Sequence, residues 1–262
     1  MSDRKVQYEA IDGVAVLTLS DPPANTYSYE MMRQLDDAIL QARMDQEVHV
    51  ILIRGEGDKF FCAGADINML QNADPTFKYY FCLHANETLN RLEQTPKLVI
   101  AALNGHTVGG GLEVAMAADI RIAKSDGGKV GLPEVHLGVL PGTGGTQRLV
   151  RIVGKAKAIE CMAEGKTFSM QEAQEMGLVQ KLLPSEGFDA AALDYAKRFT
   201  PPKKAARAVG LIKRAVQSGA EMAFGEGLAL ERELQQQLFC GEDAGEGLAA
   251  YLEKRAAEFK AR

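Results

Sequence analysis

The chain has 262 residues, with 30 Lys and Arg against 35 Asp and Glu, so its formal net charge is −5. This length fits one large domain, or one domain with a small appendage. An apolar fraction of 46% and a charged fraction of 25% exclude bulk disorder, and a mildly acidic chain without basic blocks is not expected to bind nucleic acid non-specifically.

The first part of the chain alternates between strand and helix patterns. Asp12-Gly13 separates the apolar runs Val6–Ile11 and Val14–Leu19, which predicts a hairpin because both turn positions need a positive φ. Ser28 is the expected N-cap of the helix that follows. Later elements come in the order strand His49–Arg54, a short helix capped by Asp66, helix Phe77–Leu92, strand Lys97–Leu103, helix Gly110–Ala118 and strand Asp119–Lys124.

From Gly144 onward the pattern becomes mainly helical. Only Leu178–Leu183 is expected to be a strand there. The expected helices are Lys155–Ala163, Met170–Met176, Ala190–Phe199, Lys203–Gln217, Phe224–Leu238 and Gly245–Phe259. Alternating strands and helices predict an α/β fold with crossover connections. We therefore expect an α/β core over residues 1–200 and a helical region over residues 201–262, divided at Pro201-Pro202.

Cysteines and apolar runs indicate the compartment. The four cysteines (Cys62, Cys82, Cys161 and Cys240) are widely spread, with no CxxC pair and no nearby His at zinc spacing. They are expected to be reduced thiols in a cytoplasmic protein, and no metal site is expected. The longest apolar runs, such as Leu98–Leu103, are too short to cross a bilayer. The amino-terminal twelve residues lack the apolar core of a secretory signal.

Three glycine-rich segments carry the chemical information. They are residues 60–67 (FFCAGADI), 104–113 (NGHTVGGGLE) and 131–148 (GLPEVHLGVLPGTGGTQR). Gly109-Gly110-Gly111 lies between a strand and a helix, where glycines let a ligand approach N–H groups that the helix leaves unpaired. Such donors suit an oxyanion or a phosphate, although three glycines are equally typical of a plain turn. The segment matches neither the Walker loop nor the dinucleotide-binding fingerprint.

Two glutamates accompany these turns. Glu113 lies in the first turn of an otherwise apolar helix, where a carboxylate needs a partner or a function. Glu134 follows Pro133 in a loop. Each alone is more often structural, as a first-turn charge or a surface acid. Together, beside unpaired backbone donors, they form a candidate acid/base pair.

These three segments, in this order and spacing, resemble the enoyl-CoA hydratase/isomerase (crotonase) superfamily, and the resemblance covers nearly the whole chain. It implies a spiral of β-β-α turns with a helical C-terminal trimerisation region. It also implies that the N–H groups of Ala65 and Gly110 form an oxyanion hole for an acyl-CoA thioester. Two such donors in a dry site stabilise the negative charge that develops on the thioester oxygen.

The resemblance assigns the family's two catalytic acids to Glu113 and Glu134, and a water-positioning glycine to Gly142. Family members that only move a double bond usually keep a single acid, at the position of Glu134. Hydratases keep both, so both acids favour syn addition of water to a 2-trans-enoyl-CoA. Glu134 would exchange a proton with the α-carbon and Glu113 would activate the water, with the proton route between them left open.

The same resemblance implies a coenzyme A groove and no metal or nicotinamide cofactor. Its CoA-binding residues correspond to Ala63, Ala65, Asp66, Ile67, Tyr251 and Lys254. Lys254 would reach a CoA phosphate from a neighbouring subunit of a homotrimer or homohexamer, and it could equally be a solvated helix charge. Met69 and Leu70 are expected to line the acyl pocket. Four aromatic residues between positions 77 and 81 cannot all be buried on one helix face.

Several features leave alternatives open. His106 departs from the family pattern and is interpreted as structural, with a subunit contact or a pocket position as alternatives. Tyr27 replaces a common Leu, either at the CoA entrance or as packing. The rival functions are a Δ3,Δ2-enoyl-CoA isomerase and a hydratase specialised for branched or cyclic acyl groups. The non-enzymatic alternative is a catalytically silent scaffold that binds acyl-CoA or RNA. The presence of both glutamates argues against it.

Overall fold

A computed structural model describes residues 4–261 of the chain. Its main sheet has the order β1-β2-β3-β5-β7-β10, in which β1 is antiparallel to β2 and the other neighbours are parallel. The six strands are β1 Val6–Ile11, β2 Val14–Leu19, β3 Val50–Gly55, β5 Leu98–Leu103, β7 Ile120–Lys124 and β10 Lys181–Leu183. Asp12 and Gly13 have φ values of 47° and 80°, which confirms the predicted hairpin turn.

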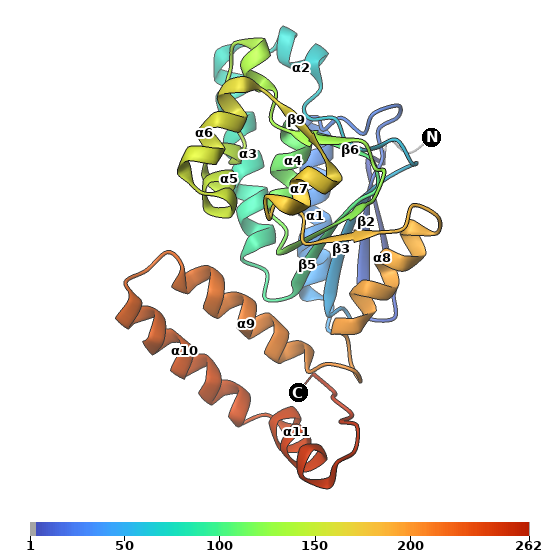
Figure 1. The fold of residues 1–262 in the computed structure, drawn as a ribbon, viewed down its shortest axis with the longest axis vertical. Helices are drawn as coiled ribbons and strands as arrows, with labels where there is room; N and C mark the ends of the chain where they lie inside the picture. Colours follow the sequence, from blue (N-terminus) through green and yellow to red (C-terminus); the bar gives the residue numbers. More distant parts are fainter. Residues whose placement is uncertain (1–3, 262) are drawn as a thin grey trace.

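Alternation along the central strands creates two cores. In β2, Leu17 belongs to the larger core beneath α1 and α3, whereas Val16 belongs to a smaller core beneath α8. Register continues this division across the sheet, because Val16 pairs with Leu52 and Leu17 with Ile53. The main sheet therefore lies between α1 and α3 on one face and α8 on the other (Figure 1).

A second sheet of four short strands lies beside the first, in the order β4-β6-β8-β9. Its members are β4 Phe60–Cys62, β6 His106–Val108, β8 Lys129–Gly131 and β9 Thr167–Ser169. Each has only three residues, which is too short to show an alternating pattern, so the sequence did not predict them. β4, β6 and β8 run parallel, and β9 is antiparallel to β8.

The helices largely follow the predicted positions. Their bounds are α1 Tyr29–Met44, α2 Ile67–Asn72, α3 Pro75–Glu93, α4 Gly110–Met116, α5 Gly145–Val153, α6 Lys155–Glu164, α7 Met170–Glu175, α8 Phe188–Ala196, α9 Ala206–Gly219, α10 Phe224–Phe239 and α11 Glu242–Glu253, with 3₁₀ turns η1 Glu134–Leu137 and η2 Lys197–Phe199. Ser28 and Asp66 cap α1 and α2 as predicted. α3 starts earlier than expected because Asp74 caps it and Pro75 occupies its first position.

Several predictions of extent were wrong. The strand expected at Leu178–Leu183 covers only Lys181–Leu183, and the helix expected at Lys203–Gln217 is Ala206–Gly219. α5 was not predicted, because glycines occupy its N-cap and first position. The loop expected at Glu134 is the 3₁₀ turn η1. The last helix ends at Glu253 rather than Phe259, because Lys254 adopts a left-handed conformation with a φ of 57° that stops the helix.

The carboxy-terminal helices α9, α10 and α11 extend away from the sheets (Figure 1). α9 is attached to the core by the buried ion pair between Lys213 Nζ and Asp119 Oδ2, at 3.0 Å. Lys213 also donates to the carbonyl oxygens of Leu92 and Lys97. The helical C-terminal region is thus confirmed, while its division from the core at residue 200 stays a prediction. Within residues 4–261, no helix has the length and apolar character needed to cross a membrane.

Candidate active site

The second sheet positions the candidate site. β4 ends immediately before Ala63, β6 ends immediately before Gly109, and β8 ends three residues before Glu134. Because these three strands are parallel neighbours, their carboxyl ends meet at one edge of the sheet. Three segments that are far apart in the sequence therefore meet at this edge, which is where parallel sheets usually bind ligands.

Two backbone donors lie in neighbouring turns at this edge. Gly64 and Gly109 have φ values of 93° and 57°, a conformation that side-chain-bearing residues rarely adopt. A Cβ placed on Gly64 would lie 3.2 Å from the nitrogen of Gly110, so the two turns are in contact. Within residues 4–261, no hydrogen-bond acceptor is found for the N–H of Ala65 or of Gly110. The predicted donors are therefore adjacent and available.

Glu113 is buried one helical turn further along α4, with 2% of its surface exposed. Its Oε1 accepts hydrogen bonds from the backbone N–H of Thr143 at 2.8 Å and of Gly145 at 2.7 Å. Its Oε2 accepts a short hydrogen bond from the Thr143 hydroxyl. A carboxylate that accepts three donors is arranged as an ionised group, because a protonated one would place its own hydrogen among them.

Glu134 has a different environment at the start of η1. Its Oε2 is buried without a hydrogen-bond partner among the described residues. A Cβ on Gly109 would lie 3.3 Å from its Oε1, so the carboxyl group lies beside the α4 turn. Burial raises the pKa of Glu134 to about 7, its own backbone N–H opposes the rise, and the charge of Glu113 adds to it. The two acids are therefore electrostatically close, and a substantial fraction of Glu134 is protonated near neutral pH.

The loop that carries Gly142 and Thr143 is held rigidly. Arg148 Nη1 donates to the carbonyl oxygen of Thr143 at 3.1 Å, and Arg148 Nη2 forms a 2.7 Å ion pair with Glu93 of α3. No acceptor for the N–H of Gly142 is found in the part of the chain that the structure describes. Gly142 directly precedes Thr143, which binds Glu113, and its role as a water-positioning glycine stays a prediction.

The predicted CoA and acyl residues lie at the open side of this edge. Asp66 caps α2 by accepting from the N–H groups of Asn68 and Met69, so its carboxylate already has a structural partner. Ile67 is 55% exposed, whereas Ala65, Met69 and Leu70 pack partly against the larger core. Ala63 is half-buried and donates to the carbonyl of Ala24. Five of these six predicted residues, all except Asp66, thus present only a backbone or an apolar surface.

Two predicted residues are not brought to the site within one chain. Tyr251 and Lys254 lie on and just after α11, at the opposite end of the molecule from α2 (Figure 1). Tyr251 is 81% exposed. Tyr251 and Lys254 would therefore contact a ligand only in the site of a second copy of the chain.

Sequence reasoning gave Thr143 no role and left Tyr27 open between the CoA entrance and packing. Thr143 supplies two of the three hydrogen bonds to Glu113, and Tyr27 contacts Thr143 through its hydroxyl. Thr143 lies inside the third glycine-rich segment, residues 131–148. For Tyr27, the only signal in the sequence was its departure from the family pattern. His106 instead lies at the start of β6, where its Nδ1 accepts from the Lys129 N–H and its ring contacts Phe60. These contacts join β6 to its neighbours and agree with a structural role.

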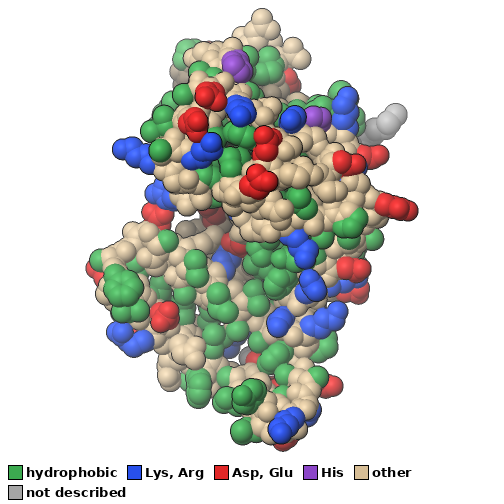
Figure 2. Space-filling model, in the orientation of Figure 1, with side chains coloured by type: hydrophobic (Ala, Val, Ile, Leu, Met, Phe, Trp, Pro, Cys, Tyr) green, Lys and Arg blue, Asp and Glu red, His purple; other side chains and the backbone are tan. Residues whose placement is uncertain are grey.

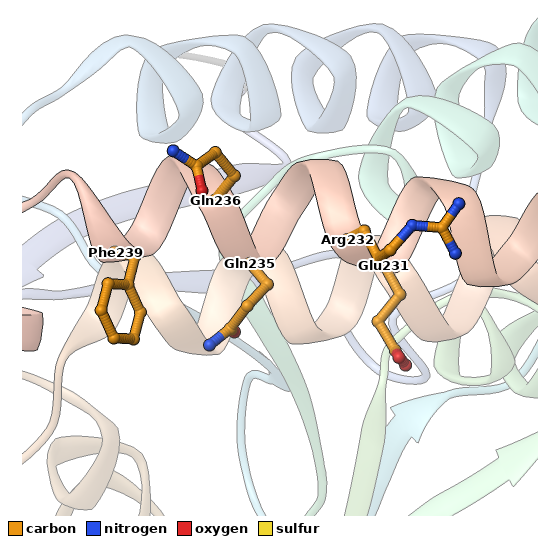
Figure 3. Close-up of a pocket in the computed structure, with 5 residues that line it drawn as sticks. All are labelled: Glu231, Arg232, Gln235, Gln236 and Phe239. Carbon is orange, nitrogen blue, oxygen red and sulfur yellow. The ribbon is translucent and has the colours of Figure 1, made fainter.

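Two surface hollows lie elsewhere. One, of about 370 Å³, is lined by Glu231, Arg232, Gln235, Gln236 and Phe239, all from α10 (Figure 3). The other, of about 300 Å³, is lined by residues 58–59, 106 and 126–128. Neither contains the two glutamates. Within residues 4–261, no group of three His, Cys, Asp or Glu side chains is placed to hold a metal ion, and the four cysteines are free thiols.

The fold and the site together define a class of enzyme. Neighbouring N–H donors stabilise negative charge on an oxygen, and two carboxyl groups in unlike surroundings move protons. The sequence profile of the enoyl-CoA hydratase/isomerase family matches residues 9–262.

Individual relatives match this chain over nearly all of its length. A probable enoyl-CoA hydratase of Bacillus subtilis is 39% identical, with 94% of this chain and 95% of that protein covered. The short-chain-enoyl-CoA hydratase of Clostridium acetobutylicum is 37% identical, with 95% of each covered. The crystal structure of an enoyl-CoA hydratase from Geobacillus kaustophilus superposes with a TM-score of 0.96 at 43% identity, covering 100% of this chain and 98% of that one.

The chain therefore belongs to the enoyl-CoA hydratase/isomerase family and has the crotonase fold. It is an enzyme of the hydro-lyase class, with the hydratase activity general to these relatives. The family also implies an acyl-CoA substrate.

Proposed function

We propose that this chain catalyses the reversible syn addition of water to a 2-trans-enoyl-CoA, giving a 3-hydroxyacyl-CoA. The observation that carries the proposal is the unlike state of the two glutamates beside two free N–H donors. Glu113 accepts three hydrogen bonds as an ionised carboxylate, and Glu134, with its pKa raised to about 7, is partly protonated near neutral pH. One ionised base and one protonated acid are the pair that hydration needs.

The steps follow from these states. The thioester oxygen accepts hydrogen bonds from the N–H groups of Ala65 and Gly110, which draws electron density from the conjugated double bond. The N–H of Gly142 and the Glu113 carboxylate orient a water molecule, and Glu113 removes its proton as the oxygen bonds to the β-carbon. Glu134 gives its proton to the α-carbon on the same face. Return of a proton from Glu113 to Glu134 restores the starting state.

The ligand's coenzyme A portion is assigned to the open side of the site. Ala63, Ala65, Asp66 and Ile67 would line its groove, and Met69 and Leu70 the acyl chain, because these residues lie next to the Ala65 donor. Asp66 takes part through its cap of α2 rather than through a free carboxylate. The reaction uses side chains and backbone of the protein and needs no further cofactor.

Assembly is the second part of the proposal. Ile212 of α9 and Phe224 and Leu228 of α10 are 61%, 82% and 40% exposed. Figure 2 shows hydrophobic side chains gathered over the region of α9–α11. An apolar surface of this extent favours association, so we propose a homotrimer or a pair of trimers. A neighbouring copy would then bring Lys254 and Tyr251 to the CoA groove. Light scattering that finds an active monomer would contradict this assembly.

The experiment that tests the reaction follows the absorbance of the conjugated thioester after purified protein is mixed with crotonyl-CoA. Loss of absorbance with formation of 3-hydroxybutyryl-CoA is expected. A 3-enoyl-CoA given in parallel tests the isomerase alternative, because an isomerase would create the conjugated absorbance and leave crotonyl-CoA unchanged. Turnover of only a branched or cyclic enoyl-CoA would identify a specialised hydratase. Binding of acyl-CoA without any turnover would identify a silent scaffold.

A further inference from the structure

Tyr27 is buried at the centre of the candidate site. Only 4% of its surface is exposed. It lies beyond the end of β2 and forms an isolated parallel bridge with Ala65. The backbone N–H of Tyr27 donates to the Gly64 carbonyl at 2.9 Å, and its own carbonyl accepts from the Asp66 N–H at 3.1 Å. Its backbone therefore holds the segment that presents the Ala65 donor.

The ring of Tyr27 contacts the second donor. A Cβ on Gly110 would lie 2.2 Å from Cε1 of Tyr27 and 2.3 Å from its hydroxyl oxygen. The ring thus lies against the α-carbon of Gly110 and occupies the space that a side chain there would take. A Leu at position 27 would have neither the length nor the hydroxyl group to make the same contacts.

The hydroxyl of Tyr27 continues toward Glu113. It lies 3.2 Å from Oγ1 of Thr143, whose hydroxyl makes the short hydrogen bond to Glu113 Oε2. The donor and acceptor at each step of this series of hydrogen bonds follow from the chemistry of the groups. An ionised carboxylate only accepts, so the single hydroxyl hydrogen of Thr143 goes to Glu113, and the hydrogen between the two hydroxyls comes from Tyr27. Aligned hydrogen bonds of this kind polarise one another.

We propose that Tyr27 is a positioning residue for the reaction, which acts through Thr143 to fix the orientation of the Glu113 carboxylate and to favour its ionised form. Through its ring and backbone, the same residue keeps the two N–H donors in register with that carboxylate. This inference rests on the proposed function, because it assigns Tyr27 a part in activating the water that Glu113 holds.

The electrostatics of Tyr27 agree with a permanent donor. Burial raises the pKa of Tyr27 well above its ordinary value of 10, the charge of Glu113 adds to the rise, and the hydrogen bond with Thr143 opposes it. The thiols of Cys62 and Cys82 are the other titratable groups that face the ring, and both act in the same direction as Glu113. The hydroxyl therefore keeps its proton throughout the working pH range.

The test is Tyr27→Phe, which removes the hydroxyl and keeps the ring against Gly110. With crotonyl-CoA, kcat is expected to fall about tenfold, the equivalent of about 1.4 kcal/mol, with KM changed less than about twofold. The acidic limb of the pH–rate profile should move to higher pH, because the ionised carboxylate loses support. Thr143→Val should lower kcat at least as much, and Thr143→Ser should restore it.

A double variant separates this role from simple packing. Tyr27→Phe should have no further effect on kcat in the Thr143→Val background, because the chain is already broken, and its full effect should return with Thr143→Ser. Tyr195→Phe is the matched control. Tyr195 lies on α8, over the other face of the main sheet, where its ring contacts Phe199, and its loss of a hydroxyl should leave kcat unchanged.

The outcomes are distinct. If the wild type is active and Tyr27→Phe keeps the same kcat and pH profile, the role of Tyr27 is overturned while the proposed function stands. Additive losses of kcat in the double variant would have the same consequence. A wild type that does not hydrate an enoyl-CoA overturns the proposed function and this inference with it. If Tyr27→Phe does not fold, the Thr143→Val and Thr143→Ser pair decides, because equal kcat values in those two variants would show that no hydroxyl chain supports Glu113.

Discussion

The two halves of the candidate site differ in how completely the carboxyl oxygens of their glutamates are paired. In the buried half (Tyr27, Gly110, Glu113 and Thr143), every residue is buried and the glutamate accepts three hydrogen bonds. In the open half (Asp66, Ile67, Met69 and Glu134), the side chains are half-buried or exposed, and one carboxyl oxygen of Glu134 has no partner among the described residues.

This difference shows how one residue type acquires two chemical states in a single site. Hydrogen bonds from several fixed donors stabilise a carboxylate, whereas burial that outweighs the available donors stabilises the neutral acid. Glu113 has the first environment and Glu134 the second. The buried half is therefore suited to hold water, and the open half to deliver a proton and accommodate different acyl groups. The predictions below perturb one half at a time.

Replacement of either acid should have the largest effect. Glu113→Gln and Glu134→Gln are each expected to lower kcat by about 10²–10⁴ while the fold is retained. In Glu113→Gln, the amide oxygen still accepts from Thr143 and Gly145, but the amide nitrogen turns the Thr143 hydroxyl around and cannot take a proton from water. Steady-state kinetics with crotonyl-CoA and circular dichroism provide the measurements.

The two acids also separate hydration from isomerisation. If Glu134→Gln alone lost activity and Glu113→Gln kept it, the comparison between the halves would fail and the isomerase alternative would gain support. Near-wild-type hydration in both variants would remove the two-glutamate mechanism altogether.

A side chain at Gly110 should come next. Gly110→Val is expected to lower kcat by about 10²–10³, the effect of losing one oxyanion donor. Because its Cβ would overlap the Tyr27 ring, the variant should also lose about 1–3 kcal/mol of unfolding free energy. Gly245→Ala is the matched control, since a Cβ at Gly245 within α11 meets no neighbour. Normal kinetics in a folded Gly110→Val protein would remove Gly110 from the oxyanion hole.

The open half should dominate the pH dependence. Since Glu134 must carry a proton to the α-carbon, kcat/KM for hydration should fall as pH rises above about 7, by about tenfold per pH unit. The folded state raises the pKa of Glu134 from 4.5 to about 7, so its contribution to stability is complete below pH 4.5 and is lost as pH rises to 7.

Denaturant unfolding measures the second effect. After allowance for solvent at this partly exposed group, the loss between pH 4.5 and 7 is expected to be about 1–2 kcal/mol. Glu134→Gln should abolish this dependence and be more stable than the wild type at pH 8. An unchanged pH dependence in Glu134→Gln would assign the titration to another group.

The acyl pocket should show the smallest effect. Met69 packs partly against the larger core next to the Ala65 segment, so Met69→Ala should alter selectivity for chain length rather than the chemical step. Each methylene in an apolar pocket is worth about 1–3 kcal/mol in kcat/KM, and the variant should lose part of that increment. A series of enoyl-CoA chain lengths measures it. A series that is flat in both proteins would place the acyl chain elsewhere.

Local signals in the sequence located most of the main elements. Patterns within a few residues predicted the Asp12-Gly13 turn, the Ser28 cap and the strand Lys97–Leu103. The structure has the turn and the cap, and its strand covers Leu98–Leu103. The same is true of the aromatic run in α3, where Phe81 is buried and Tyr79 and Tyr80 are 65% and 60% exposed. The three-residue strands of the second sheet have no such local pattern, so only pairing with distant segments defines them.

Motifs in the sequence identified the residues of the candidate site, but they did not predict the protonation state or the hydrogen-bond partners of each residue. Resemblance singled out Glu113 and Glu134 alike, and nothing within either motif distinguishes a paired carboxylate from an unpaired one. That distinction arises from partners 30 and 32 positions away for Glu113 and from burial beside the α4 turn for Glu134. Tyr27 shows the same limit over 116 positions, because its hydroxyl meets Thr143 only after the strands have paired. Local chemistry determined which groups this chain possesses, and long-range packing decided which of them hold a proton and which are held in place.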